Sequence, residues 1–133
     1  MKVESGNERP SRKGPAEWFT GTAWIDEIAE GAEPSRVRLY RVAFEPGART
    51  AWHTHPLGQV LHVLAGVGRV QAEGQPVREI RPGDTVRFAP GERHWHGAAP
   101  GNMMVHLALQ EATAEGVATA WMEHVTEVQY NAR

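Results

Sequence analysis

Five side chains that could bind a metal ion lie in two short stretches of the sequence. His53 and His55 are two residues apart, so on an extended strand both imidazoles leave the same face. Gln59 follows shortly after, and His94 and His96 form a second same-face pair farther along the chain. Imidazole nitrogens and amide oxygens bind divalent cations, among them manganese, iron, cobalt, nickel and zinc. The predicted ligands of one divalent metal ion per chain are His53, His55, Gln59 and His94.

The spacing of these residues resembles the two sequence motifs of the cupin family. The first motif is matched by Gly47, His53, His55, Gln59 and Gly66. The second motif is approximated by Pro82, Gly83, Asp84, Pro90, Gly91 and His94. The chain departs from the family at Gln59, where the motif has a glutamate, at Pro90, which is displaced by one position, and at Ala98, which replaces an asparagine. Two such spacings in one chain make a specific match.

Longer phrases narrow the resemblance within the family. The segments EPGARTAWHTHPLGQ (45–59) and PGERHWHGAAP (90–100) are similar to segments of small bacterial cupins that act as manganese-dependent hydroxynitrile lyases. The glutamine ligand and an ending like WMEHVTEVQY (121–130) are shared with those enzymes as well. The resemblance implies manganese as the metal and the cleavage of cyanohydrins as the reaction.

The hydrophobic pattern predicts strands and few helices. Residues 36–45 alternate with period two, and further short stretches are separated by glycine and proline residues. The aromatic and β-branched stretch 18–25 predicts the first strand. Short strands with regular turn signals indicate an all-β, antiparallel sandwich or barrel. The resemblance narrows this fold class to the cupin jelly-roll β-barrel.

At 133 residues the chain has room for one domain with a proper core. Residues 1–15 are polar and predict a short N-terminal arm, and residues 16–133 predict a single cupin domain with its metal-binding core over 36–112. The tail over 113–133 is a predicted C-terminal extension. Residues 117–125 could form a helix or an added strand, which the resemblance favours, and Thr126 and Glu127 predict a turn that opens a short helix.

Two histidines outside the predicted ligand set are expected to face the same cavity. His96 has the parity of His94, and His106 shares a face with Gln110 on the last core strand. Because imidazole titrates near neutral pH, both are candidate catalytic residues, with His96 as general base; the alternative for each is a hydrogen-bonded core histidine. The expected lining of a substrate pocket is Tyr40, Val42, Leu61, Met104 and Gln110.

Gln59 in place of a glutamate removes a negative charge from the predicted metal site. Three neutral imidazoles and an amide leave a divalent ion its full +2 charge, which favours Lewis-acid chemistry and anion binding. The predicted function is a metal-dependent lyase that cleaves or forms cyanohydrins of an aldehyde or ketone and hydrogen cyanide. The alternatives are a metal-dependent oxidase or dioxygenase and a non-catalytic, ligand-sensing cupin.

Composition narrows the partners of the protein. The net charge is −2 and basic and acidic residues are interspersed, which argues against nucleic acid or a membrane surface and leaves a small molecule as the expected partner. The absence of cysteine excludes thiol catalysis and thiolate metal sites. No apolar run approaches the ~20 residues of a membrane span, and a cytoplasmic protein is expected.

One predicted strand has an apolar outer face, formed by Val37, Leu39 and Ala43. Such a face predicts a homo-oligomer, either a dimer or a tetramer.

Overall fold

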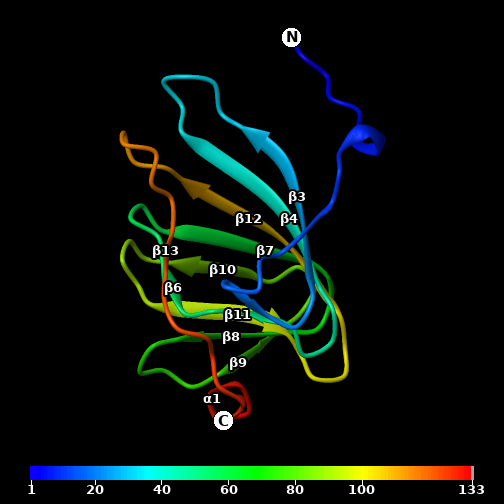
Figure 1. Ribbon diagram of the computed structural model, residues 1–133, viewed down its shortest axis with the longest axis vertical. Helices are drawn as coiled ribbons and strands as arrows, with labels where there is room; N and C mark the ends of the chain where they lie inside the picture. The colour runs from blue at the N-terminus through cyan, green and yellow to red at the C-terminus, as the bar shows by residue number, and fades with distance from the viewer. Residues whose placement is uncertain (133) are drawn as a thin grey trace.

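The computed structural model describes residues 1–132, and its regular secondary structure consists almost entirely of antiparallel strands in two layers (Figure 1). The predicted all-β, antiparallel fold is confirmed. One sheet has the order β1-β3-β4-β12-β7-β10. In that order its strands are Arg12–Lys13, Ala23–Glu30, Val37–Phe44, Met104–Glu111, Gln59–Gly66 and Thr85–Phe88.

The second sheet has the order β13-β6-β11-β5-β2, with β8 paired to β11 and β9 paired to β8. Its strands are Ala120–Trp121, His53–Thr54, His94–Ala98, Arg49–Thr50, Phe19–Thr20, Gly68–Ala72 and Arg78–Ile80. The helical elements within residues 1–132 are a 3-10 turn, η1 (Gly6–Glu8), and one short helix, α1 (Glu127–Tyr130). Both stretches with predicted ligands therefore lie in or beside the second sheet, apart from Gln59, which opens β7 of the first.

The main core fills the space between the sheets, where alternate residues of β4, β7 and β12 point inward. In the central rows, Val42 lies opposite His106, and His106 lies opposite Val63. Leu61 and Met104 are fully buried in this core. The alternation of the sequence predicts this inward face correctly because one strand residue in two must leave the water.

The predicted strand over 18–25 is wrong in one respect, since the structure divides it into β2 and β3. Gly21, with φ of 76°, makes the corner between them, and a φ of this sign is open to glycine at no steric cost. The corner sends β2 into the second sheet and β3 into the first. Trp18, just before β2, thereby reaches the cavity described below.

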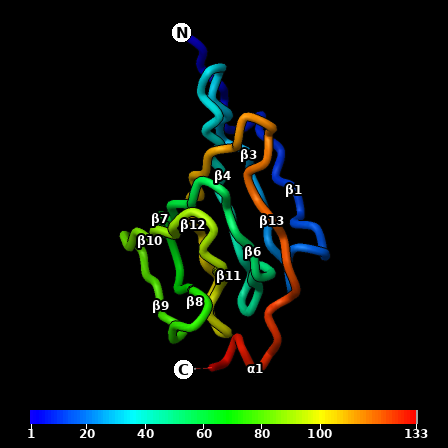
Figure 2. Tube along the Cα trace, turned by 90° about the vertical axis from the view of Figure 1, so that its left-hand side faces the viewer, coloured from blue at the N-terminus to red at the C-terminus, as the bar shows by residue number. Residues whose placement is uncertain are grey.

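The C-terminal tail forms a strand and then a short helix, so the strand alternative holds for its first part. In β13, Trp121 pairs with His53 of β6. The predicted short helix is present as α1, and Thr126 caps it in a capping box with Gln129. Figure 2 shows the tail passing along one side of the molecule to α1. Arg133 lies outside the described residues.

A second, smaller core fastens α1 to the second sheet. It contains Trp52, Trp95, Val125 and Tyr130. The Tyr130 hydroxyl donates to the Ala98 carbonyl at 2.5 Å, and the buried Arg49 guanidinium lies 4.4 Å from the centre of the Tyr130 ring. Trp52 and Trp95 are therefore packing residues on the side of the second sheet that faces away from the cavity.

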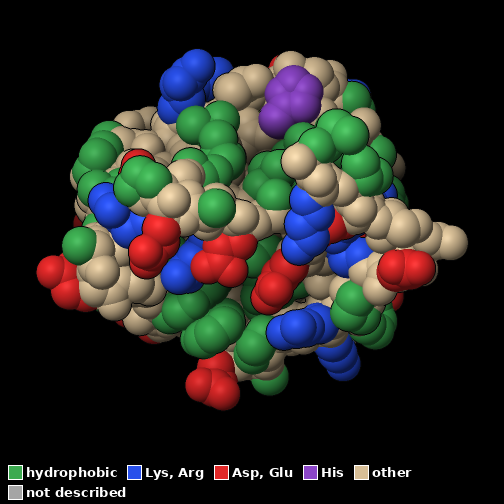
Figure 3. Space-filling model, turned by 90° about the horizontal axis from the view of Figure 1, so that it is seen from above, with side chains coloured by type: hydrophobic (Ala, Val, Ile, Leu, Met, Phe, Trp, Pro, Cys, Tyr) green, Lys and Arg blue, Asp and Glu red, His purple; other side chains and the backbone are tan. Residues whose placement is uncertain are grey.

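Acidic and basic side chains alternate on the molecular face seen in Figure 3. The outer side of the first sheet differs, because it carries large apolar residues that are about two-fifths exposed. These include Trp24, Leu64 and Leu109. Within residues 1–132, no helix has the length and apolar character needed to cross a membrane.

Candidate metal centre and cavity

Four imidazoles converge between the ends of β6 and β11. His53 and His94 are directly paired across these two strands, and their ring centres are 4.3 Å apart. The His55 ring lies 4.9 Å from that of His53 and 5.4 Å from that of His94. A ring nitrogen from each of His53, His94 and His96 lies within 4.8 Å of the others. The structure thus brings the predicted histidine ligands together and places His96 beside them.

Backbone carbonyls fix the rings of the three predicted histidine ligands. Nδ1 of His53 lies 2.8 Å from the Ala51 oxygen, and Nδ1 of His55 lies 2.7 Å from the Ala118 oxygen. Nδ1 of His94 lies 2.8 Å from the oxygen of Glu92. A carbonyl only accepts, so each Nδ1 carries the hydrogen and each Nε2 keeps a free lone pair. Metal-binding histidines are held in this way.

Gln59 completes the group with an oxygen. Its Oε1 lies 3.2 Å from Nε2 of His94, while its Nε2 donates to Oε1 of Gln110 at 2.8 Å. Because the His94 hydrogen is on Nδ1, both atoms of the 3.2 Å contact carry lone pairs and repel each other. A cation between them turns this repulsion into attraction. The donor set therefore fits a divalent metal ion.

Burial keeps these imidazoles uncharged. Loss of hydration lowers the pKa of His94 to about 3 and the pKa of His55 below its ordinary value. For His53, burial and then the neighbouring His94 and His55 hold the pKa well below the usual range. Metal binding needs the deprotonated ring, so the predicted ligand histidines are in the form that a metal ion requires at neutral pH.

His96 and His106 form a buried pair next to this group. Nε2 of His106 lies 2.9 Å from Nδ1 of His96, and the two residues are 4% and 0% exposed. Within residues 1–132, Nε2 of His96 and Nδ1 of His106 have no hydrogen-bond partner. Burial and the neighbouring His106 hold the pKa of His96 well below its ordinary value, and burial lowers that of His106 to about 4. His96 therefore presents a neutral ring to the cavity.

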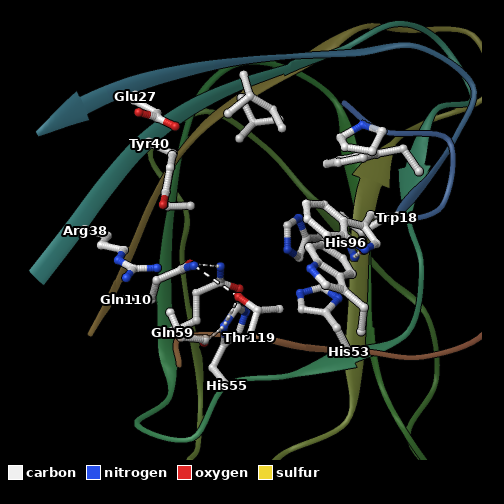
Figure 4. A pocket seen from close by; sticks show the side chains of 18 of the residues that line it. Trp18, Glu27, Arg38, Tyr40, His53, His55, Gln59, His96, Gln110 and Thr119 are labelled. Carbon is white, nitrogen blue, oxygen red and sulfur yellow. Dashed lines mark hydrogen bonds between the residues drawn. The ribbon is translucent and has the colours of Figure 1, made fainter. Parts of the chain in front are cut away.

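Four of these histidines, His53, His55, His96 and His106, line a cavity of about 630 Å³ (Figure 4). Of the predicted pocket residues, Tyr40, Val42 and Gln110 line it. Leu61 and Met104 do not line it and pack in the core, so their place in the predicted pocket is withdrawn. Parity gives the inward face of a strand but cannot tell which inward residues meet the empty part of the barrel.

The sequence reasoning missed an aromatic wall that three separate segments build. Trp18 and Trp121 stack with ring centres 5.0 Å apart, and Trp121 also lies 4.7 Å from the His53 ring. Phe19 lies 6.1 Å from Trp121. The sequence carries no motif that joins residues 18–19 to residue 121, so only the folded chain reveals this wall.

Comparison with known proteins places the chain in a family. Residues 40–109 match the model of the Cupin domain, which is more than half of the chain. Over 130 residues the chain is 57% identical to a protein named (R)-mandelonitrile lyase from Granulicella tundricola, and the match covers 98% of each protein. The resemblance read from the motifs is thus confirmed.

Solved structures agree with this assignment. A cupin-like protein from Thermotoga maritima is 40% identical with a TM-score of 0.82, and the match covers 89% of each chain. The polyketide cyclase RemF from Streptomyces resistomycificus has a TM-score of 0.75 at 19% identity, covering 98% of this chain and 90% of that one, which is a likeness of fold alone. With its two-layered barrel and converging histidines, the chain belongs to the cupin family.

Proposed function

We propose that the protein is a metal-dependent lyase that cleaves and forms cyanohydrins. The observation that carries this proposal is the unpartnered Nε2 of His96, which belongs to a residue that lies beside His53 and His94 and lines the cavity. A base next to a Lewis-acid site suits the removal of a hydroxyl proton. The similarity to a protein named mandelonitrile lyase supports this choice of reaction.

The metal part of the proposal is one divalent ion per chain, held by His53, His55, Gln59 and His94. Manganese is the proposed ion by family resemblance, and Fe²⁺, Zn²⁺, Ni²⁺ and Co²⁺ are the other ions that these ligands accept. When bound, the ion supplies a Lewis acid that favours negative charge on the substrate oxygen. The four neutral ligands leave its charge undiminished.

The residues of the chain supply the proton transfers. Nε2 of His96 takes the hydroxyl proton of the cyanohydrin, and the electron pair of the O–H bond forms the carbonyl. The bond between the carbinol carbon and the nitrile carbon breaks, and its electron pair leaves with cyanide. His96 then returns the proton to cyanide, so that one aldehyde or ketone and one molecule of hydrogen cyanide result.

His106 holds His96 in the form that this step needs. To accept a proton at Nε2, His96 must carry its own hydrogen on Nδ1, which then donates to Nε2 of His106 at 2.9 Å. After the transfer, the same hydrogen bond stabilises the charged His96 ring. His106 is therefore proposed as the second residue of the proton-transfer pair.

The cavity favours an aromatic cyanohydrin as the small-molecule substrate. Trp18, Phe19 and Trp121 give it an apolar wall, and the Tyr40 and Gln110 side chains give it polar groups. An aryl ring packs well against such a wall. Mandelonitrile, a phenyl-substituted cyanohydrin, is accordingly the substrate of choice for the first test.

The test is to incubate protein loaded with Mn²⁺ with mandelonitrile, with and without oxygen. The proposal expects benzaldehyde release that does not depend on oxygen. Oxygen consumption with another substrate would support the oxidase or dioxygenase alternative, and neither result would support a sensor. The metal is tested in parallel: the double variant His53→Ala/His55→Ala should lose most of its bound metal, and full occupancy in it would refute the site.

A homo-oligomer remains part of the proposal. The apolar residues on the outer side of the first sheet support it, since a monomer rarely exposes a continuous apolar face. Trp121 belongs to the second sheet and lines the cavity, so it is not part of this apolar face. A cytoplasmic location stays a prediction of the sequence.

A further inference from the structure

A chain of side-chain hydrogen bonds leads from the proposed metal centre to the C-terminal tail. Nε2 of Gln59 donates to Oε1 of Gln110 at 2.8 Å, and Nε2 of Gln110 donates to Oγ1 of Thr119 at 3.3 Å. Oγ1 of Thr119 in turn lies 3.3 Å from Nδ1 of His55 (Figure 4). This series of hydrogen bonds therefore begins at one proposed ligand, Gln59, and ends beside another, His55.

This chain of hydrogen bonds has a direction, because the two ends of an amide differ. Gln59 can turn either Oε1 or Nε2 toward His94, but only the oxygen has lone pairs to offer a cation. With Oε1 turned inward, Nε2 of Gln59 needs an acceptor, and Oε1 of Gln110 is that acceptor. Oγ1 of Thr119 then accepts a hydrogen bond from Nε2 of Gln110.

If every hydrogen bond in this series ran in the opposite direction, the same side chains would still be paired, but a metal ion could no longer bind at the proposed centre. In that arrangement, the Thr119 hydroxyl donates to Gln110, Gln110 donates to Oε1 of Gln59, and Nε2 of Gln59 donates to the bare Nε2 of His94. An N–H group would then face the position of the cation and repel it. Gln59 is only 6% exposed, so water does not readily take over the part of a lost protein acceptor.

We propose that Gln110 is a positioning residue for metal binding. Its side-chain oxygen holds the Gln59 amide with Oε1 toward the centre, and Thr119 holds Gln110 in the matching orientation. The inference rests on the metal site proposed above and adds to it the residues that choose between the two directions of the chain.

A double-mutant cycle on the affinity for Mn²⁺ alone tests this role. The affinity is measured on purified, metal-stripped protein by competition with a chelator. Gln110→Leu, which is similar in size but has no acceptor, should weaken binding about 10–100-fold, as losses of a ligand's hydrogen-bond partner do. In a Gln59→Glu background the same change should alter the affinity by less than about 2-fold, because both carboxylate oxygens can bind the ion.

Thr119 offers a matched pair for the same question. Thr119→Val keeps the shape and removes the hydroxyl, so it should weaken Mn²⁺ binding in the same direction as Gln110→Leu. Thr119→Ser keeps the hydroxyl and should restore the affinity of the parent. This pair also carries the test if Gln110→Leu does not fold, and equal affinities of the two Thr119 variants would overturn the proposal.

The outcomes separate this inference from the proposed function. If Gln110→Leu costs the same affinity in both backgrounds, Gln110 does not act through the Gln59 amide, and the positioning role is overturned while the metal site stands. If the parent binds no Mn²⁺, the metal site itself is refuted, and this inference with it. If Gln110→Leu weakens Mn²⁺ binding in the parent background alone, the result supports both the metal site and the positioning role of Gln110.

Discussion

At the scale of single residues, the hydrogen-bond partner of one ring nitrogen distinguishes the proposed ligands from the proposed base. A backbone carbonyl lies within hydrogen-bond distance of Nδ1 in each of His53, His55 and His94. Because a carbonyl can only accept, the ring hydrogen stays on Nδ1. His96 faces His106, and an imidazole can either donate or accept. The rings of the three proposed ligands are therefore held in one tautomer, while the ring of His96 remains able to exchange a proton.

The first prediction follows from this difference. His96→Ala should leave the metal content near that of the parent and lower mandelonitrile turnover about 10²–10⁴-fold, the usual contribution of a positioned base. Metal analysis and a benzaldehyde assay on the same preparation measure both quantities. His62→Ala, which removes an exposed histidine, is the matched control and should change neither. Joint loss of metal and activity in His96→Ala would instead assign His96 to the ligand set, as its distance from His53 and His94 allows.

A second prediction concerns acid and the metal-free protein. Burial lowers the pKa of five histidines in the folded state: His53, His55, His94, His96 and His106. Unfolded histidine has a pKa of about 6.5, so below this pH the unfolded chain binds more protons than the folded one. The stability that these histidines contribute is complete above about pH 6.5 and is lost as the pH falls toward their folded pKa values, about 4 for His106 and about 3 for His94.

Urea unfolding at several pH values, with a chelator present, checks this. Between pH 6.5 and 5 the free energy of unfolding should fall by up to about 1.4 kcal/mol per pH unit for each such histidine. His106→Leu removes one of them and should make the slope shallower. A stability that is flat over this range would show that the folded and unfolded chains bind equal numbers of protons, and that burial does not lower these pKa values.

At the scale of elements, the C-terminal tail belongs to the site as much as the barrel does. Its Ala118 carbonyl fixes His55, its Thr119 joins Gln110, and its Trp121 lies against His53. Farther along the tail, Tyr130 packs against the second sheet. The guanidinium carbons of Arg49 and Arg69 lie 4.4 Å and 5.0 Å from the centre of its ring. We therefore expect that loosening the contacts of Tyr130 also weakens metal binding at the proposed centre.

Tyr130 variants test that link. Tyr130→Ala should cost about 3–5 kcal/mol of stability, as the loss of a buried aromatic ring does, and should also weaken Mn²⁺ binding because residues 118–121 loosen. Tyr130→Phe keeps the ring and loses only the hydrogen bond to Ala98, so it should cost about 1 kcal/mol and leave metal affinity unchanged. Parent-like metal affinity in Tyr130→Ala would show that residues 118–121 hold their place without α1.

At the scale of the whole molecule, the sequence predicted what periodicity and motif spacing control. The period of two predicted the inward face of β4, and the two motifs predicted that His53, His55, Gln59 and His94 meet. Neither signal depends on how distant segments pack. The fold class and the convergence of these four side chains could therefore be predicted before the structure was known; their role as metal ligands stays a prediction.

What could not be predicted depends on packing between segments that are distant in the sequence. Leu61 and Met104 have the parity of cavity residues, but the neighbouring core fills the space in front of them. Trp18 and Trp121 come from opposite ends of the chain and meet only because Gly21 turns β2 into the second sheet. The order of the hydrogen bonds around Gln110 likewise requires the placed tail.

The last prediction concerns the apolar outer side of the first sheet. Leu39 and Leu109 are neighbours across β4 and β12 there, and Leu109 is 40% exposed. Light scattering at micromolar concentration should find a dimer or a tetramer, and Leu109→Lys should lower the mass to that of a monomer, because a charge on this face opposes association. Val128→Lys, on the exposed side of α1, is the control and should leave the mass unchanged. A monomeric parent contradicts the prediction.

The stacking of Trp18 on Trp121 has a consequence for biosynthesis. The ribosome releases Trp18 early, and the strands β6 and β11, which carry His53, His94 and His96, emerge before Trp121. A nascent chain that ends at β11 already has the three proposed histidine ligands but lacks the Ala118 carbonyl that fixes His55. We therefore expect the proposed ligands to be loosely held in such a chain. We expect the affinity of the proposed site for its metal to be established only after residues 118–121 have left the ribosome.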